Sequence, residues 1–360
     1  MKRDLLAYLV CPECRGNFEV RAHRVENEEI MEGQLVCSGC EAAFPVRGGV
    51  PRMVSRDLAP AKVATAEAFG YEWTHYSRLT EADEAEFLDW IKPLTPESFA
   101  GRVVLDGGCG KGRHVSLAAR FQAREVIGID LSDAVDAAFQ NTRHLPNVHI
   151  VQGDIFKLPF AAPFDLAYSI GVLHHLPDPR AGFLSLAKHV RAGGRIAFWV
   201  YGKEGNGWLE KFVNPIRIHV TSVVPKPVTQ ALSFLLALPL YAALKLVYGP
   251  LEHNAALKRH LPYADYLCAI SSYSFAENLW NVFDHLVAPT TFYVSRGEVE
   301  SWLAAAGLEA GEVSARNGNS WRATGLAPEP GFVAEPVASR DDARPAPAYG
   351  TPQSIGQEFV

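Results

Sequence analysis

The sequence has little net charge, few cysteines and no apolar run of the length that crosses a bilayer. Its 34 basic and 40 acidic residues leave a formal charge of −6, so the whole molecule exerts no attraction on nucleic acid. Six cysteines in 360 residues are too few for the disulfide framework of a secreted protein. Residues 227–244 carry no charge, but Pro239 interrupts them and a bilayer span takes about 20 apolar residues. The first apolar run, Leu5–Val10, is short for a signal peptide, so we expect a cytoplasmic protein without an export signal.

Four of the cysteines are nevertheless present as two close pairs. Cys11 and Cys14 form one pair and Cys37 and Cys40 the other, with 22 residues between the pairs. Each pair can place two sulfurs on one tetrahedral ion about 2.3 Å away. Four thiolates fill such a site, so we predict a structural zinc ion in a zinc ribbon over residues 1–56. Two redox pairs without a metal are the alternative.

The middle of the chain alternates short apolar runs with segments of helical periodicity, at about 112–122, 132–142 and 179–190. The predicted strands are Val103–Asp106, Glu125–Asp130, Val148–Val151, Phe164–Ser169 and Arg195–Tyr201. Apolar strands separated by helices predict an α/β fold, a Rossmann-like parallel sheet with helices on both faces. Residues 308–316 and 321–326 are expected to close this sheet as a hairpin.

A glycine-rich loop follows the first predicted strand directly and precedes the first predicted helix. Asp106 begins it, and Gly108, Gly110 and Gly112 leave room for a ligand to approach the backbone. A tight turn that binds nothing is the alternative. A dinucleotide fingerprint needs a glycine where this chain has Arg113, and the carboxylate of Asp106 would repel a pyrophosphate. The loop therefore favours a ligand that carries an ammonium and a sulfonium group.

Acidic residues recur at the ends of the first three predicted strands. Asp106, Asp130 and Asp154 are each 24 residues apart. Because the carboxyl ends of parallel strands share one edge of a sheet, we expect the three side chains to line one crevice.

Together these segments resemble the class I S-adenosylmethionine-dependent methyltransferases, in the branch that includes the ubiquinone and menaquinone methyltransferases. The matching segments are Val104–Gly112, Ile129–Ser132, Gly153–Ile155, Phe164–Asp165, Gly171–Asp178 and Ala192–Arg195. The resemblance implies S-adenosylmethionine as the cofactor. It also implies that Asp106 and the backbone of Gly108 and Gly110 hold the methionine part, Asp130 the ribose hydroxyls, Asp154 and Ile155 the adenine, while Ser169 lines the methionyl end. Gly112 and Leu131 are further expected cofactor-binding residues.

A general base is optional in methyl transfer, and two histidines are candidates for it. His174 and His175 follow the fourth predicted strand, next to the expected transfer point, and histidine titrates near neutrality. The alternative is that they only pack the connection to the next helix. Asp284 and His285 are further candidate bases, and the aromatic residues around them and in 69–73 are candidate pocket walls.

The organisation predicted from these patterns has four parts. They are the zinc ribbon 1–56, a linker with helices 57–100, the methyltransferase domain 101–326 with a helical lid inserted at 203–290, and a proline-rich disordered tail 327–360. Residues 201–260 hold seven basic and three acidic side chains beside their apolar stretch. An apolar stretch with basic flanks can lie on a membrane, cover a lipid-like substrate or form a buried lid.

These patterns favour a methyltransferase that acts on oxygen, nitrogen or carbon of a small-molecule or lipid-linked metabolite. Nucleic acid is disfavoured because residues 1–56 hold eight basic and eight acidic side chains. The expected partners are a small-molecule or lipid-like acceptor and, through residues 220–250, the inner face of a membrane.

Two alternatives remain open. A ribbon joined to a methyltransferase resembles ribosomal RNA guanine methyltransferases, which would make RNA the acceptor. The ribbon also resembles the small activator subunit of tRNA methyltransferases, which would allow an interaction module that binds the cofactor without turnover.

Overall fold

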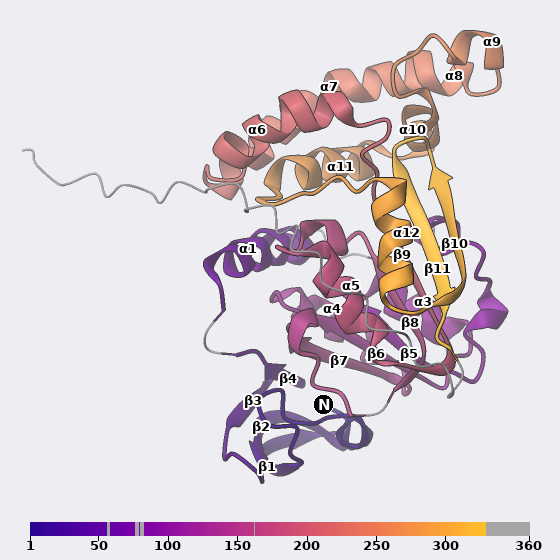
Figure 1. Ribbon diagram of the computed structural model, residues 1–360. Helices are drawn as coiled ribbons and strands as arrows, with labels where there is room; N and C mark the ends of the chain where they lie inside the picture. Colours follow the sequence, from indigo (N-terminus) through magenta and orange to yellow (C-terminus); the bar gives the residue numbers. More distant parts are fainter. Residues whose placement is uncertain (56–57, 76–78, 80–82, 162, 329–360) are drawn as a thin grey trace, which may run out of the picture.

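The computed structural model describes residues 1–328 except 56–57, 76–78, 80–82 and 162. Beyond Pro328, the predicted disordered tail lies outside the described residues. Within the described part, eleven strands form one sheet in the order β1-β2-β3-β4-β7-β6-β5-β8-β9-β11-β10 (Figure 1).

The central strands are parallel and follow the predicted alternation. They are β5 (Val103–Gly107), β6 (Glu125–Asp130), β7 (Val148–Gly153), β8 (Phe164–Ile170) and β9 (Val190–Tyr201). The hairpin of β10 (Glu309–Arg316) and β11 (Ser320–Leu326) pairs antiparallel with β9. The predicted α/β fold class is confirmed.

Helices cover both faces of this sheet, as expected for strands that are apolar throughout. The helices that follow the central strands are α3 (Arg113–Arg120), α4 (Ala134–Thr142), α5 (Pro179–Ala187) and α12 (Arg296–Ala305). Neighbouring residues of β5 point to opposite faces: Leu105 packs in the cluster that contains Phe183 of α5, and Val104 in the cluster that contains Val115 of α3. Two cores therefore enclose the sheet and fix the positions of its strand ends.

The N-terminal module continues the same sheet. Its strands β1 (Phe18–Glu26), β2 (Glu29–Cys37), β3 (Ala43–Arg47) and β4 (Val50–Met53) are antiparallel, and β4 then pairs in parallel with β7. Side chains reinforce this seam, since Lys2 Nζ donates to the carbonyls of Leu145 and Val148 at 2.5 and 2.9 Å. Arg15 donates likewise to the carbonyl of Leu158 at 2.8 Å. The module is thus an edge of the larger sheet.

The remaining helices, apart from α2, which packs against α3, gather above the carboxyl ends of the central strands (Figure 1). They are α1 (Pro60–His75), α2 (Asp83–Trp90), α6 (Asn214–Ile216), α7 (Lys226–Ala243), α8 (Gly249–Leu251), α9 (Ala255–Lys258), α10 (Ala264–Ala269) and α11 (Phe275–Val287). Short 3-10 or π turns lie at Arg3–Ala7, Pro96–Ser98, Ile155–Lys157, Leu173–His175, Leu209–Val213, Arg217–Thr221, Leu244–Tyr248 and Ile270–Ser272.

One helical run among the described residues, Lys226–Leu251, is long and apolar enough to cross a membrane by length and composition alone. Only 22% of its most apolar window is buried, and Leu235 and Leu246 are 64% and 77% exposed. On its other side, Ala237 and Leu244 are fully buried. Core helices of soluble proteins meet the same two criteria, so the run by itself assigns no membrane.

Candidate functional site

A cavity of about 130 Å³, the strand-end cavity, lies at the carboxyl ends of the central strands. Six of the residues predicted for a cofactor line it together with one predicted base. The cofactor residues are Gly108, Gly110, Asp130, Leu131, Asp154 and Ile155, and the base is His175. Residues from three successive strand ends therefore meet in one crevice, which is the usual place for a ligand in an open α/β sheet.

The glycine loop is fastened to the neighbouring strand through Asp130. Its Oδ2 accepts a hydrogen bond from Gly110 N at 2.9 Å, and its Oδ1 accepts from Ser132 N and Ser132 Oγ at 2.8 and 2.7 Å. Gly108 has φ +95°, and a Cβ there would lie 2.3 Å from a methyl carbon of Val172. The loop thus needs glycine at position 108 for both its backbone angle and its close packing.

Asp154, at the end of the third strand, is held between its own backbone turn and a cation. Its Oδ1 accepts from Phe156 N at 3.0 Å, and its Oδ2 pairs with Lys62 Nζ at 2.5 Å. Lys62 belongs to α1, whose side chains from Lys62 to Trp73 cover the cavity. The segment that follows the ribbon is therefore a roof of this cavity as well as a connection.

Four predicted site residues lie outside the lining of the strand-end cavity, and two of them are acidic or polar. Asp106 is fully buried, and burial raises its pKa well above the usual value although the neighbouring Tyr168 hydroxyl lowers it. Ser169 is buried and donates to the carbonyl of Gly107 at 2.7 Å. Their roles in cofactor binding stay predictions, and for Asp106 the structure differs from the expectation that its side chain faces the crevice.

The other two are a backbone turn and a histidine. Gly112 has φ +82° and caps the start of α3. His174 is 1% exposed, and its ring lies 4.0 Å from that of Tyr201 between centroids. Neither lines the cavity, so their proposed roles rest on the sequence alone.

A second cavity of about 390 Å³, the aromatic cavity, lies between β9 and the inserted helices. Aromatic side chains from several segments of the chain line it, namely Trp73, Trp90, Trp199, Tyr201, Trp208, Tyr263, Tyr266, Tyr273, Trp280 and Tyr293. Its volume lies within the range of small-molecule sites, and its walls are rings that can stack on a planar ligand. The sequence indicated part of this wall through the aromatic residues around 69–73 and 283–293.

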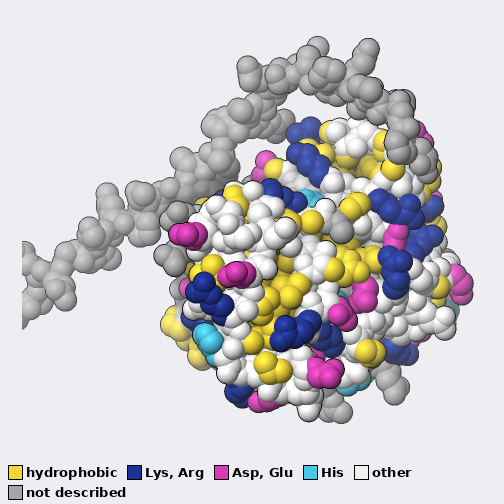
Figure 2. Space-filling model, turned by 90° about the horizontal axis from the view of Figure 1, so that it is seen from below, with side chains coloured by type: hydrophobic (Ala, Val, Ile, Leu, Met, Phe, Trp, Pro, Cys, Tyr) yellow, Lys and Arg dark blue, Asp and Glu magenta, His cyan; other side chains and the backbone are white. Residues whose placement is uncertain are grey.

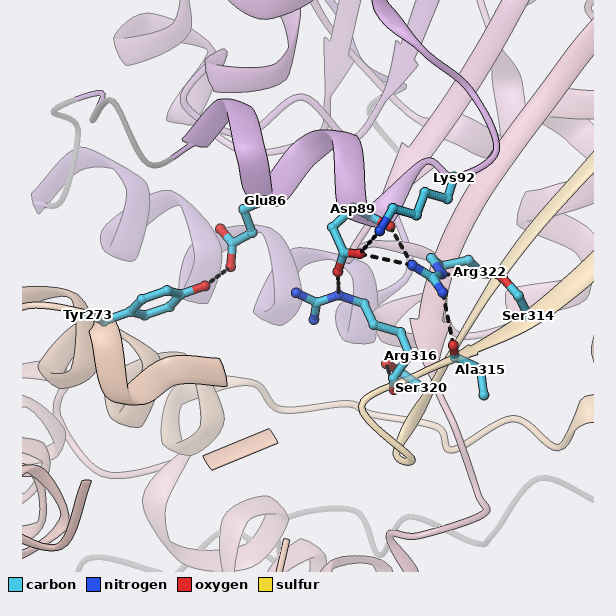
Figure 3. Close-up of polar contacts among 9 residues, drawn as sticks. All are labelled: Glu86, Asp89, Lys92, Tyr273, Ser314, Ala315, Arg316, Ser320 and Arg322. Atoms are coloured by element: carbon cyan, nitrogen blue, oxygen red, sulfur yellow. Dashed lines mark hydrogen bonds and ion pairs between the residues drawn. The ribbon is translucent and has the colours of Figure 1, made fainter. Parts of the chain in front are cut away.

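Ion pairs brace one side of the aromatic cavity (Figure 3). Asp89 of α2 pairs with Arg316 at 2.5 Å and with Arg322 at 3.0 Å, which ties α2 to the hairpin of β10 and β11. Burial alone would raise the pKa of Asp89, but bonds from Lys92 and Arg316 outweigh it and hold the pKa below its usual value. Glu86, one turn earlier, accepts a hydrogen bond from Tyr273 Oη of the insertion.

The two cavities meet at a shared wall. Trp73, Arg113, Ile170, Gly171, His175 and Asp284 line both of them. Burial raises the pKa of Asp284 to about 6, and Tyr201 Oη donates to its Oδ2 at 3.4 Å. Burial lowers the pKa of His175 to about 3, and its Nδ1 lies 2.7 Å from the carbonyl of Thr290. Of these two groups, Asp284 is the one poised to exchange a proton near neutral pH.

The four paired cysteines form a cluster in the N-terminal module. Their sulfurs all lie within 4.8 Å of one another, with 3.6 Å between Cys11 and Cys40 and 3.4 Å between Cys14 and Cys37. A Cβ on Gly16 would lie 3.0 Å from the sulfur of Cys37, so the turn around the cluster has no room for a side chain there. This donor set and spacing suit a tetrahedral zinc ion that leaves no open position.

Two family models match this chain. A model described as methyltransferase domain matches residues 105–198, and a model described as Trm112p-like protein matches residues 2–49. The predicted resemblances of both parts are thereby confirmed. The matches also bear out the predicted cofactors, S-adenosylmethionine for the methyltransferase domain and zinc for the four-cysteine module.

Curated relatives are similar over part of the chain. A tRNA U34 carboxymethyltransferase of Pseudoalteromonas translucida is 35% identical over 122 residues, which are 33% of this chain and 36% of that protein. A trans-aconitate 2-methyltransferase of Deinococcus radiodurans is 38% identical over 126 residues, 35% of this chain and 47% of that protein. The chain therefore spans about a third to a half of the length of these relatives.

Solved structures match at lower similarity. A complex of the Haloferax volcanii Trm112 methyltransferase activator with a methyltransferase is 14% identical, covers 76% of this chain and all of that one, and has a TM-score of 0.41. An S-adenosylmethionine-dependent methyltransferase of Listeria monocytogenes is 27% identical over 34% of this chain and 56% of that one, with a TM-score of 0.30.

The names of several relatives contradict the predicted acceptor, a small-molecule or lipid-like metabolite, and the exclusion of nucleic acid, while they do not bear on the predicted membrane contact through 220–250. These relatives are named for tRNA. The physical reason for the error is that a charge sum does not describe one site. Figure 2 views the molecule from below Figure 1, where the N-terminal module lies, and shows basic and acidic side chains interspersed. Arginines nevertheless gather around the aromatic cavity, at positions 113, 217 and 316.

Proposed function

We propose that this chain, which joins a methyltransferase domain to a Trm112-like module, is an S-adenosylmethionine-dependent methyltransferase that acts on RNA. The observation that carries the proposal is the shared wall of the two cavities. One cavity is lined by the glycine loop and by acids at strand ends, and the other is lined by aromatic rings. The tRNA named in the relatives supports RNA as the acceptor.

In the strand-end cavity, Asp130 and Asp154 would hold the cofactor. Asp130 already orders the glycine loop, so its carboxylate is placed to accept bonds from ribose hydroxyls. Asp154 and the backbone after it would face the adenine, and Lys62 above them would keep the adenine end covered. When bound, S-adenosylmethionine supplies an electrophilic methyl group on a sulfonium.

The aromatic cavity would hold the acceptor base. RNA bases that leave their stack are commonly bound between aromatic side chains, because every base has a face that stacks. Trp199 and Tyr201 of β9 are within the rigid sheet, so they would fix the plane of such a base relative to the shared wall. The helical insertion would exclude water from the same space.

Asp284 would take a proton from the acceptor atom as that atom attacks. It lines both cavities, and its pKa of about 6 leaves it ionised at neutral pH. His175 lies in the same wall, but its pKa of about 3 keeps it neutral and makes it a weak base. We therefore assign proton transfer to Asp284 and a positioning role to His175.

The test is methyl transfer from labelled cofactor to fractions of a cell extract. The purified chain is incubated with S-adenosylmethionine labelled in the methyl group, and RNA, lipid and soluble metabolites are then separated. We expect label in RNA that ribonuclease releases, and much less with the Asp284→Asn variant. Label confined to lipids or metabolites would refute RNA as the acceptor. Binding of cofactor without any methyl transfer would refute the proposal that the chain is an enzyme.

A further inference from the structure

Three arginines line the aromatic cavity in the described part of the chain, and two of them have acidic partners. Arg113 Nη1 lies 3.4 Å from Glu86 Oε2, and Arg316 Nε lies 2.5 Å from Asp89 Oδ2. Arg217 forms no ion pair within 4.0 Å with any described residue. Of the three, it is therefore the arginine without an ion pair to a described residue, and its charge acts on the carboxylate of Asp284 only from beyond that distance.

Arg217 is also among the most buried polar residues of the cavity wall. It is 2% exposed, and it belongs to the short turn Arg217–Thr221 of the insertion. Its Nη2 donates to Asn214 Oδ1, while its Nε is buried without a hydrogen-bond partner. Thr221 Oγ1 donates to the carbonyl of Leu286 at 2.8 Å, which fixes this turn against α11. A buried guanidinium with an unpaired donor is costly, and an anionic ligand would remove that cost.

The titratable groups that face Arg217 come from several elements. Asp284 and His285 lie on α11, His174 and His175 follow β8, and Tyr201 and Tyr293 complete the set. Asp284 is the acid among them, and it lies beyond ion-pair distance. Tyr293 also forms a side-chain hydrogen bond with Arg217, so the donor of the guanidinium that is open to a ligand is Nε.

We propose that Arg217 binds a phosphate of the acceptor, and that the aromatic cavity thus takes a single nucleotide with its base between the rings. This rests on the proposed RNA acceptor and adds a binding residue to it. A guanidinium matches a phosphate because it can donate two parallel hydrogen bonds, and the unpaired Nε belongs to such a fork.

The burial of Arg217 sets the form of the substrate. A guanidinium that is 2% exposed cannot reach the backbone of a stacked duplex from outside the cavity. The nucleotide must therefore enter the cavity as an unstacked unit, carrying its phosphate inside. A buried positive charge without an ion-pair partner within 4.0 Å among the described residues also predicts a preference for a charged nucleotide over the neutral nucleoside with the same base.

The test uses the tryptophans of the cavity as reporters. The full chain, saturated with S-adenosylhomocysteine, is titrated with the four nucleoside 5′-monophosphates and with the matching nucleosides, and tryptophan fluorescence is followed. We expect at least one monophosphate to bind ~10-fold or more tightly than its nucleoside. Arg217→Gln should abolish this difference, Arg217→Lys should retain part of it, and Arg259→Gln, an exposed arginine of the same insertion, should leave it unchanged.

Two results would overturn the inference. One is equal binding of every monophosphate and its nucleoside to the unaltered chain, and the other is a preference that survives in Arg217→Gln. Thermal unfolding and cofactor affinity check that Arg217→Gln is folded. If that variant does not fold, the preference for monophosphate measured with Arg217→Lys tests the inference instead. Because this assay needs no turnover, its failure is distinct from failure of methyl transfer to RNA.

Discussion

At the scale of single residues, three acids with equal spacing in the sequence have three different surroundings. Asp106 is fully buried beside the Tyr168 hydroxyl, Asp130 accepts bonds from the loop backbone, and Asp154 pairs with Lys62. The apolar runs before them were enough to predict that each ends a strand. Their burial depends on side chains from elsewhere in the chain, such as Tyr168 and α1, and local patterns carry no information on those contacts.

Replacement of Asp130 by alanine tests the strand-end cavity. We expect the dissociation constant for S-adenosylmethionine to rise ~10- to 100-fold, because a charged acceptor is worth about 1.5–3 kcal/mol. Calorimetric titration measures the change. Asp133→Ala, an exposed acid three residues later, is the control and should leave the affinity within a factor of two. An unchanged affinity in Asp130→Ala would remove this residue from the cofactor site.

The pH dependence of turnover tests Asp284. Its pKa of about 6 is above the ordinary value of 3.8, so the carboxylate gains a proton as the pH falls through 6. We expect turnover to rise with pH up to about 6 and then to level off. Asp284→Asn should lower turnover ~100-fold or more and remove this rise, because a general base contributes about 10²- to 10⁴-fold.

The raised pKa of Asp284 also makes stability depend on pH, and stability should change with pH in the direction opposite to turnover. Between pH 3.8 and about 6, the folded chain holds a proton on Asp284 that the unfolded chain has released. The contribution of this group to stability therefore falls as the pH rises through that window. Asp265→Asn, at an acid of the insertion that is 63% exposed, is the matched control for both measurements. A pH profile that Asp284→Asn leaves intact would assign the proton transfer to another group.

At the scale of elements, the seam between β4 and β7 depends on a glycine that packs against α4. Gly49 precedes β4 with φ +82°, and a Cβ there would lie 2.4 Å from Phe139 Cζ. Its neighbour Gly48 has φ +56° as well, but a Cβ there would meet only an Asp136 oxygen at 3.8 Å. The two positions share the backbone requirement and differ in the space available.

Alanine substitutions at Gly48 and Gly49 therefore distinguish the cost of backbone strain from the cost of displacing the Phe139 ring. Gly48→Ala should lower the free energy of unfolding by ~1–2 kcal/mol, the cost of a left-handed alanine. Gly49→Ala should cost a further ~1–3 kcal/mol because the ring of Phe139 must move. Denaturant unfolding measures both values. Equal destabilisation by the two substitutions would show that the packing of Phe139 on Gly49 contributes nothing to the seam.

The elements also differ in how far the sequence could predict them. The parallel strands and their helices follow from periodicity, since each is stabilised by its own apolar face. The pairing of β4 with β7 joins residues 100 positions apart, Arg52 with Gln152, and a strand of four residues that includes Pro51 gives little signal for such a partner. The sequence did offer Asp284 as a candidate base, but it gave no signal for Arg217 in the same cavity wall, because that wall is assembled from turns and helices of the insertion.

At the scale of the whole molecule, removal of zinc tests how the N-terminal module is coupled to the rest. A chelator should increase amide hydrogen exchange in β1 to β4 and, through the shared edge, in β7. Cofactor affinity should change less than ~10-fold, because no described residue of the module lines the strand-end cavity.

Zinc should restore protection in this experiment and magnesium should not, since four thiolates prefer the softer ion. If the chelator abolished turnover while the amides of β1 to β4 stayed protected from exchange, the metal would take part in catalysis. That result would contradict the structural role that its four-cysteine site indicates.

The continuous sheet has a consequence for how the two family domains work together. Strands β4 and β7 belong to one polypeptide, so the association between them is intramolecular and has an effective concentration that dilution does not change. Two separate subunits would dissociate as their concentration fell below the dissociation constant. Specific activity of this chain should stay constant on dilution, and a cell that makes it has no need to match the supply of two gene products.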